Sequence, residues 1–188
     1  MISCRSQVPA DLPPKLASHD ACIWALGTSS LGKTEEEYTR ITYDYAVSIV
    51  SALGEVERAR EGKEPFKFVL ISGNGADQEE KSSVMFARVK GRTEKYLLDL
   101  PPESKIQAYA LRPSGFAPED PIIMKNTRST TQRLLLGLFM PVFATLIPSR
   151  FIRVGDLSRF ALETAKGRWG DEKVFDNVRM KKMVAGIN

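Results

Sequence analysis

The chain has 188 residues, which suits one domain with a sizeable core, and we expect a single domain spanning residues 1–188. Its apolar fraction of 43% and charged fraction of 27% are those of an ordinary soluble globular protein. The net charge of +4 mildly favours anionic ligands but is too small and too dispersed to indicate nucleic-acid binding. Two cysteines do not make a disulfide scaffold, and one histidine offers no zinc site, so no metal is expected.

Two segments bear on where the protein is located. Residues 1–20 are rich in proline, predict irregular structure and hold no apolar core of signal-peptide length, which favours a cytoplasmic protein. The longest apolar stretch, residues 134–147, is shorter than the ~20 residues that span a bilayer, and Pro141 interrupts it. We therefore expect a buried helix there, with membrane association through residues 134–147 as the alternative.

The first strand and the first long helix are predicted before residue 55. The continuous apolar run of residues 21–26 is typical of a strand buried on both faces. Thr34 and Glu37 have the spacing of a capping box, which predicts that a helix begins at about residue 35. Apolar residues at helical spacing continue this helix to about residue 53, and Gly54 is expected to end it.

The same alternation continues along the chain. Residues 66–71 predict a second strand, and a helix capped by Ser82 or Ser83 is expected to run to about residue 100. Residues 106–111 predict a third strand. Strands that alternate with helices at this spacing favour an α/β fold, with a parallel sheet and helices on both of its faces. Ligands of such sheets bind at the carboxyl ends of the strands.

The last third of the sequence is less regular. About residues 120–188 predict a small helical extension of the same domain. Within it we expect an apolar helix at residues 129–147, a short strand at residues 151–154 and a helix that starts after Asp156. A basic run near the C-terminus is expected to form a solvated tail: Arg179, Lys181 and Lys182.

Residues 27–34 match the phosphate-loop pattern G-x-x-x-x-G-K-[ST], from Gly27 to Thr34. The match follows a predicted strand and precedes a predicted helix, as a phosphate loop does. Lys33 would then reach the phosphates, and the Thr34 hydroxyl would bind magnesium. The mechanism also needs an acidic magnesium partner at the end of another buried strand, but the predicted strands end in Ser-Gly and Arg-Pro. A phosphate-loop NTPase therefore remains an alternative.

A second candidate site involves Ser72, Phe86 and Lys90. Phe86 and Lys90 lie one helical turn apart, and Ser72 ends the strand before their helix. This layout is typical of short-chain dehydrogenases, in which a tyrosine transfers the proton, the lysine lowers its pKa and the serine polarises the substrate carbonyl. The alternative is an amphipathic helix whose exposed Lys90 pairs with Glu94 at the i+4 position.

Four stretches of the sequence carry a family resemblance. They are HDACIWALGTSSLGKTEEEYTRITYDYAVSIVSAL, FKFVLISGNGAD, MFARVKGRTEKYLLDL and YALRPSGF. In this order they resemble the atypical short-chain dehydrogenases that include the Tat-interacting protein and its fungal relatives. The shared features are an LGT segment, a strand ending in S-x-x-G-A-D, a V-K-G-x-x-E helix and an R-P after the next strand. The resemblance covers about residues 19–118.

The resemblance implies a Rossmann-type fold that binds NADP or NAD. It implies that Ser72 is the catalytic serine and that Lys90 is the active-site lysine, which also contacts the cofactor. By the same resemblance, further residues would line the dinucleotide beyond the first strand or flank its nicotinamide end: Leu26, Gly27, Thr28, Arg112 and Pro113.

Two departures from the family pattern matter. Phe86 occupies the position of the usual tyrosine, so the usual proton donor is missing; Tyr96 lies about 15 Å further along the helix and cannot replace it. The family's strand, G-x-x-G-x-x-G turn and helix are also missing. The predicted strands then correspond to 4-5-6 of a sheet with the order 3-2-1-4-5-6. The edge of residues 21–26 would lie open for pairing, for example in a homodimer.

These observations predict an NAD(P)-dependent oxidoreductase or a nucleoside-sugar-epimerase-like protein, with impaired catalysis. Its partners would be a dinucleotide and a small-molecule substrate whose identity stays open, as does the choice between NAD and NADP. A non-catalytic binding or regulatory protein on the same fold is the first alternative, and the phosphate-loop NTPase is the second.

Overall fold

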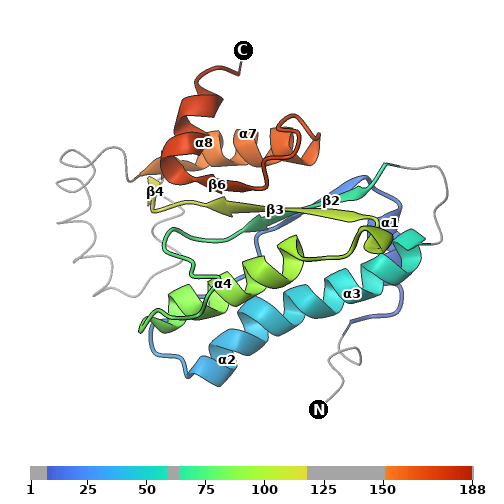
Figure 1. Ribbon diagram of the computed structural model, residues 1–188, viewed down its shortest axis with the longest axis horizontal. Coiled ribbons are helices and arrows are strands. Elements are labelled where there is room, and N and C mark those ends of the chain that lie inside the picture. Colours follow the sequence, from blue (N-terminus) through green and yellow to red (C-terminus); the bar gives the residue numbers. More distant parts are fainter. Residues whose placement is uncertain (1–7, 59–63, 118–150, 188) are drawn as a thin grey trace.

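The computed structural model describes residues 8–58, 64–117 and 151–187 (Figure 1). The expected apolar helix at residues 129–147, and with it the membrane alternative for residues 134–147, lies outside these ranges. The helices and strands, in chain order, are α1 (Leu12–Ala17), β1 (Ala21–Trp24), α2 (Glu35–Thr39), the π-helical η2 (Arg40–Asp44), α3 (Tyr45–Arg58), β2 (Phe66–Ile71), α4 (Met85–Leu98), the 3-10 helix η3 (Pro102–Ser104), β3 (Ile106–Arg112), β4 (Phe116–Ala117), β5 (Ile152–Arg153), α7 (Val154–Ala165), β6 (Val174–Asp176) and α8 (Asn177–Val184).

Four strands form one parallel sheet with the order β1-β2-β3-β6. The parallel sheet is therefore confirmed, and β2 has the bounds that its apolar run predicts. The sheet also contains a strand that was not predicted, because β6 has only three residues and shows no usable alternation. The strand expected at residues 151–154 is shorter, and its two residues pair with β4 in a separate small sheet.

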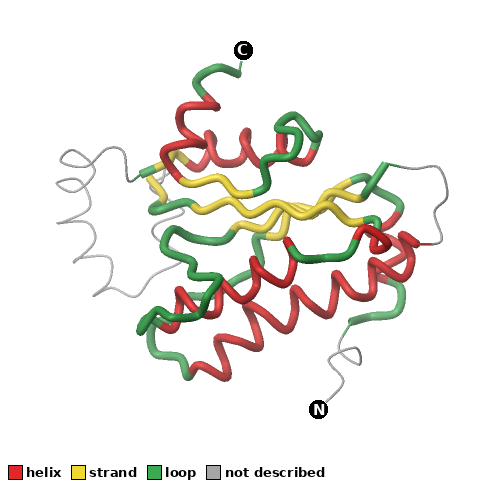
Figure 2. The backbone as a smooth tube through the Cα atoms, in the orientation of Figure 1, coloured by secondary structure: helices red, strands yellow, loops and turns green. Residues whose placement is uncertain are grey.

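Helices cover both faces of the sheet, as predicted. Figures 1 and 2 show α2, η2, α3 and α4 on one face and α7 and α8 on the other. The side chains of β2 alternate between the two layers: Phe66 and Phe68 join the core under α3 and α4, whereas Val69 joins the core under α7 and α8. Because β6 runs beside β3, the C-terminal part is built into the sheet rather than appended to it.

The capping box is confirmed, but the end of its helix is not. The Thr34 hydroxyl accepts a hydrogen bond from the Glu37 backbone N–H at 3.2 Å, and the Glu37 carboxylate accepts one from the Thr34 N–H at 3.0 Å. The helix does not end at Gly54: it continues through η2 and α3 to Arg58. Gly54 is buried, and a Cβ there would lie 3.6 Å from Ile106 Cδ1. The glycine therefore lies inside the helix beside the start of β3, where a Cβ would make an ordinary van der Waals contact, and does not mark a helix end.

Other predicted bounds also need correction. The strand expected at residues 21–26 ends at Trp24 and is an edge strand with a partly exposed Ile23, so it is not buried on both faces. The N-terminal segment contains the short helix α1, which packs on α3. Neither Ser82 nor Ser83 caps α4, which begins at Met85 after Val84, because both serines belong to the preceding loop. The basic run predicted as a tail lies on α8: Arg179, Lys181 and Lys182.

Candidate functional site

The carboxyl ends of β2 and β3 lie side by side and form the framework of the candidate site. The Ser72 backbone N–H donates to the Leu111 carbonyl at 2.8 Å, and the Asn74 N–H donates to the Pro113 carbonyl at 2.9 Å. The chain that follows β2 therefore continues along the end of β3. Ser72, predicted as the catalytic serine, comes within backbone contact of the segment that holds Arg112 and Pro113.

Lys90 reaches this edge from α4. Its Nζ donates hydrogen bonds to the backbone carbonyls of Ile71 at 3.1 Å and Ser72 at 3.3 Å. Burial lowers the pKa of Lys90 from 10.5 to about 8, and the nearby Glu94 carboxylate opposes this effect. The alternative of an exposed surface lysine is therefore wrong: the Lys90 side chain is mostly buried and faces the end of the sheet.

Ser72 and Phe86 complete a small cluster around Lys90. Ser72 is 6% exposed, and its hydroxyl has no hydrogen-bond partner among the residues that the structure describes. The Phe86 ring packs on the next residue, since a Cβ at Gly73 would lie 2.5 Å from Phe86 Cζ. A serine, a lysine and a ring at the usual tyrosine position therefore meet at the end of β2. A buried hydroxyl without a partner is uncommon and is a reason to look for a ligand there.

Arg112 forms an ion pair with Glu94, which the sequence analysis considered as a partner of Lys90. Its Nε donates to Glu94 Oε1 at 3.0 Å, and its Nη2 forms an ion pair with the same carboxylate. Gln78 Nε2 donates to Glu94 Oε2 at 2.9 Å. Glu94 is fully buried, and its hydrogen bonds raise the pKa of Arg112. The V-K-G-x-x-E motif contains Glu94, but its spacing gives no sign that the partner lies on β3.

The loop between β2 and α4 packs tightly on the helix that carries Lys90. The Asp77 N–H donates to the Ala87 carbonyl at 2.9 Å, and the Asp77 carboxylate accepts from the Ser82 N–H at 2.7 Å. A Cβ at Gly91 would lie only 1.8 Å from the Asp77 carbonyl oxygen. Gly91 is therefore required where the loop backbone crosses α4, and it holds Gln78 close enough to reach Glu94.

The segment after β1 is more open. Leu26 is 49% exposed, and a Cβ at Gly27 would meet no atom within 4 Å. In the phosphate-loop pattern, the Thr34 hydroxyl is engaged in the helix cap rather than turned toward a ligand. Leu26, Gly27 and Thr28 thus remain predictions as cofactor contacts, and Thr34 has a structural role.

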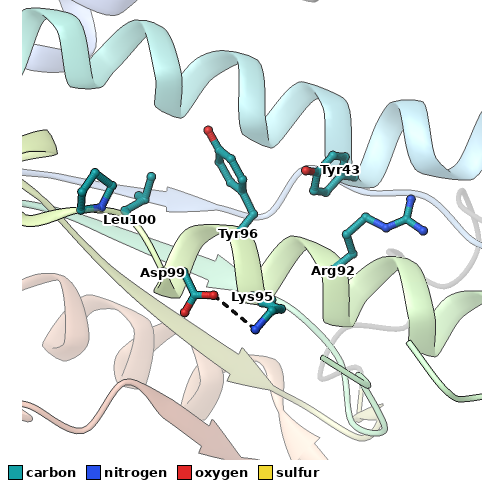
Figure 3. A pocket seen from close by; sticks show the side chains of 7 residues that line it. Tyr43, Arg92, Lys95, Tyr96, Asp99 and Leu100 are labelled. Atoms are coloured by element: carbon teal, nitrogen blue, oxygen red, sulfur yellow. Dashed lines mark ion pairs between the residues drawn. The ribbon is translucent and has the colours of Figure 1, made fainter. Parts of the chain in front are cut away.

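A groove of about 400 Å³ lies elsewhere on α4 (Figure 3). Tyr43 of η2 and Tyr96 of α4 face each other edge to face, with ring centroids 6.0 Å apart. The Arg92 guanidinium lies 5.8 Å from the Tyr43 ring centroid and is paired with Glu80. The lining residues that belong to α4 lie on the opposite side of this helix to Lys90, so the groove is separate from the predicted site. The residues that line the groove are Tyr43, Arg92, Lys95, Tyr96, Asp99, Leu100 and Pro101.

The described ranges offer neither a metal-binding cluster nor a helix that could cross a membrane. No cluster of three or more His, Cys, Asp or Glu side chains there could hold a metal ion. Within the same ranges, no helix combines the length and the apolar character needed to cross a membrane.

Comparison with known proteins adds evidence on the fold. No protein-family model matches the chain, and no curated protein matches it significantly. The structure is similar to an oxidoreductase of the short-chain dehydrogenase/reductase family from Burkholderia thailandensis, with a TM-score of 0.57 and 13% identity over 88% of this chain and 68% of that one. It is also similar to a UDP-glucose 4-epimerase from Thermotoga maritima, solved with UDP-glucose, with a TM-score of 0.56 and 12% identity over 96% of this chain and 66% of that one.

This chain spans about two thirds of the length of each of these proteins. At 12% and 13% identity the likeness concerns the fold and not the activity. With its parallel sheet covered by helices on both faces, the chain has a Rossmann-like α/β fold that is similar to the folds of these two proteins.

Proposed function

We propose that this chain is an NAD(P)-dependent protein of the short-chain dehydrogenase type, an oxidoreductase or a nucleoside-sugar-epimerase-like protein, with Ser72 and Lys90 as its reactive residues. The observation that carries the proposal is the cluster at the end of β2: Lys90 Nζ bonds the Ser72 carbonyl, and Phe86 packs on Gly73. The similarity in fold to an oxidoreductase and an epimerase supports the same class.

The residues at the end of β2 fit the nicotinamide end of a dinucleotide. The buried Ser72 hydroxyl lacks a partner, and the Lys90 ammonium has three N–H groups, of which two are used by backbone carbonyls. One donor therefore remains for a ribose hydroxyl, and the serine hydroxyl remains for a carbonyl oxygen. The sequence holds no G-x-x-G-x-x-G turn, so the fit concerns the nicotinamide end and not the pyrophosphate.

The chemistry of the site divides between the dinucleotide and the protein. A bound nicotinamide cofactor supplies or accepts a hydride. Lys90 holds the ribose end and places a positive charge beside the reacting carbonyl, while Ser72 donates a hydrogen bond to the carbonyl oxygen. Phe86 has no hydroxyl, so proton transfer at that position is missing. We therefore propose that the site binds the dinucleotide and turns over slowly.

Finer features of the proposal come from the sequence motifs. The resemblance of the LGT, S-x-x-G-A-D, V-K-G-x-x-E and R-P segments supports the proposal that the chain is related to the atypical members of the Tat-interacting-protein type and their fungal relatives. Leu26, Gly27 and Thr28 would contact the dinucleotide after β1. The outer edge of β1, which pairs only with β2 among the described strands, would serve as the contact in a homodimer.

The proposal is tested by titrating the purified chain with NADPH, followed by nicotinamide fluorescence and by the thermal midpoint. Lys90→Ala should abolish binding, whereas Lys95→Ala should leave it unchanged, because Lys95 is an exposed lysine on the same helix. If NADPH and NADH both fail to bind the wild-type chain, the proposal is wrong. Stabilisation by Mg-ATP that disappears in Lys33→Ala would instead favour the phosphate-loop alternative.

A second experiment tests whether the site lacks only the hydroxyl that a tyrosine at position 86 would provide. Phe86→Tyr should raise the rate of NADPH oxidation with a panel of aldehydes and ketones, because it restores a proton donor beside Ser72 and Lys90. The thermal midpoint of the variant serves as the control, since the ring tip already touches Gly73. Binding of NADPH without any turnover in a folded Phe86→Tyr variant would favour a non-catalytic binding protein.

A further inference from the structure

Glu94 is a fully buried acidic residue that no role in the predicted site explains. It lies on α4, one helical turn after Lys90, and its exposed fraction is 0%. Transfer of a carboxylate from water to a protein interior costs several kcal/mol unless charges and hydrogen bonds compensate it. The partners of Glu94 therefore show what the buried carboxylate does.

The carboxylate of Glu94 connects two segments that border the site. Arg112, at the end of β3, donates to Oε1 at 3.0 Å and forms an ion pair with the carboxylate. Gln78, in the loop after β2, donates to Oε2 at 2.9 Å. A single side chain on α4 thus ties the loop after β2 to the carboxyl end of β3.

Glu94 also acts on the charge of Lys90. Both residues lie on the sheet side of α4, four positions apart. The groups that face the Lys90 ammonium are the carbonyls of Ile71, the last residue of β2, and of Ser72, which follows it, and the carboxylate of Glu94. Arg112 of β3 is bound to this carboxylate. Glu94 is the negative charge among these groups, and it favours the protonated lysine that burial disfavours.

We propose that Glu94 is a positioning residue for the nicotinamide end of the site: it aligns the ends of β2 and β3 through Gln78 and Arg112, and it keeps Lys90 positively charged. This inference rests on the proposed function in so far as it concerns a dinucleotide. It also changes the role expected of Arg112, whose guanidinium is engaged by Glu94 and supports the site from behind rather than contacting the cofactor.

The test measures the reactivity of Lys90 and does not require a ligand. The full chain is labelled with an amine-specific acetylating reagent between pH 6 and 10, and acetylation of Lys90 is quantified by mass spectrometry. In Glu94→Gln the labelling rate of Lys90 at pH 7 should rise about fivefold, because removal of a nearby carboxylate lowers the pKa of a buried amine. Glu94→Asp keeps the charge and should restore most of the wild-type profile.

Glu80→Gln is the matched control. Glu80 also accepts hydrogen bonds from an arginine of α4, Arg92, but this pair lies at the protein surface. The control should leave the labelling of Lys90 unchanged. If Glu94→Gln alone does not fold, the double variant Glu94→Gln/Arg112→Gln removes both members of the Glu94–Arg112 ion pair and should show the same increase in labelling.

The outcomes separate the inference from the proposed function. An unchanged pH profile of Lys90 labelling in a folded Glu94→Gln variant overturns the inference, whether or not NADPH binds. Increased labelling together with weaker NADPH binding supports both. Increased labelling in a protein whose wild type binds no dinucleotide supports the charge coupling and overturns the role at a nicotinamide site.

Discussion

Of the arginine–glutamate pairs that attach α4 to its surroundings, two differ clearly in burial. Arg112 and Glu94 meet behind the candidate site, where the glutamate side chain is 0% exposed and the arginine side chain 24% exposed. Arg92 and Glu80 meet beside the groove on the outer side of α4, with side chains 37% and 35% exposed. The same chemical pair thus occurs on α4 both in the protein interior and in contact with water.

The difference shows which contacts hold the site together. A buried carboxylate loses its hydration and depends on its partners, whereas an exposed pair exchanges protein contacts for water at little cost. The inner pair should therefore be essential for the geometry at the ends of β2 and β3. The outer pair should contribute little, although its geometry is equally good.

The largest effect is expected from removing the arginine of the inner pair. Arg112→Ala should lower the free energy of unfolding by about 3–5 kcal/mol, because it leaves the Glu94 carboxylate buried without its cation. Urea denaturation near neutral pH measures the loss. Glu94→Gln added to Arg112→Ala should recover part of it, since a neutral amide costs less to bury. A loss below 1 kcal/mol for Arg112→Ala would mean that water reaches Glu94.

The next effect concerns the backbone crossing that serves both pairs. The loop that carries Gln78 and Glu80 touches α4 at Gly91, where a Cβ would lie 1.8 Å from the Asp77 carbonyl oxygen. Gly91→Ala should therefore destabilise the protein by about 1–3 kcal/mol, because the loop must move away. Gly27→Ala is the control, as its Cβ would meet no atom within 4 Å, and it should change stability by less than about 0.5 kcal/mol. Equal effects of the two substitutions would contradict the close contact at Gly91.

A third prediction uses pH to test the inner side of α4. Burial lowers the pKa of Lys90 to about 8, so between about pH 8 and 10.5 the folded state binds fewer protons at this group than the unfolded state does. The stability of the wild type should therefore rise with pH in this window relative to Lys90→Met, by up to roughly 3 kcal/mol across the whole window. Chemical denaturation of both proteins at several pH values measures the difference. A constant difference would show that Lys90 keeps the pKa of an exposed lysine.

Local sequence signals predicted much of the fold and only part of the site. The apolar run at residues 66–71 and the capping box at Thr34 are short-range patterns, and both appear as predicted. Gly54 shows the limit of such patterns, because a glycine that ends a helix and a glycine that packs against a strand look alike in sequence. The strand β6 is recognisable only once β3 is available as its neighbour.

The candidate site shows even more clearly that short-range sequence patterns do not reveal contacts between distant elements. The motifs predicted Ser72 and Lys90 as site residues, and in the structure the Lys90 ammonium donates a hydrogen bond to the Ser72 backbone carbonyl. The role of Glu94 was missed because its partner Arg112 lies 18 residues away on another element. The burial of Lys90 was also not predictable from spacing. A lysine and a glutamate four positions apart have the spacing of a surface ion pair, whether their side of the helix is exposed or buried.

The smallest effect is expected at the outer pair, and it completes the comparison. Arg92→Ala should lower the free energy of unfolding by less than about 1 kcal/mol, because Glu80 can return to water and only the contact with the Tyr43 ring is lost. The loss should shrink further in high salt, which screens exposed charges. Urea denaturation of Arg92→Ala and Arg112→Ala under the same conditions compares the two pairs directly. If both substitutions lower the free energy of unfolding equally, burial does not distinguish the two pairs. The inference that the buried Glu94 supports the site behind Lys90 would then be wrong.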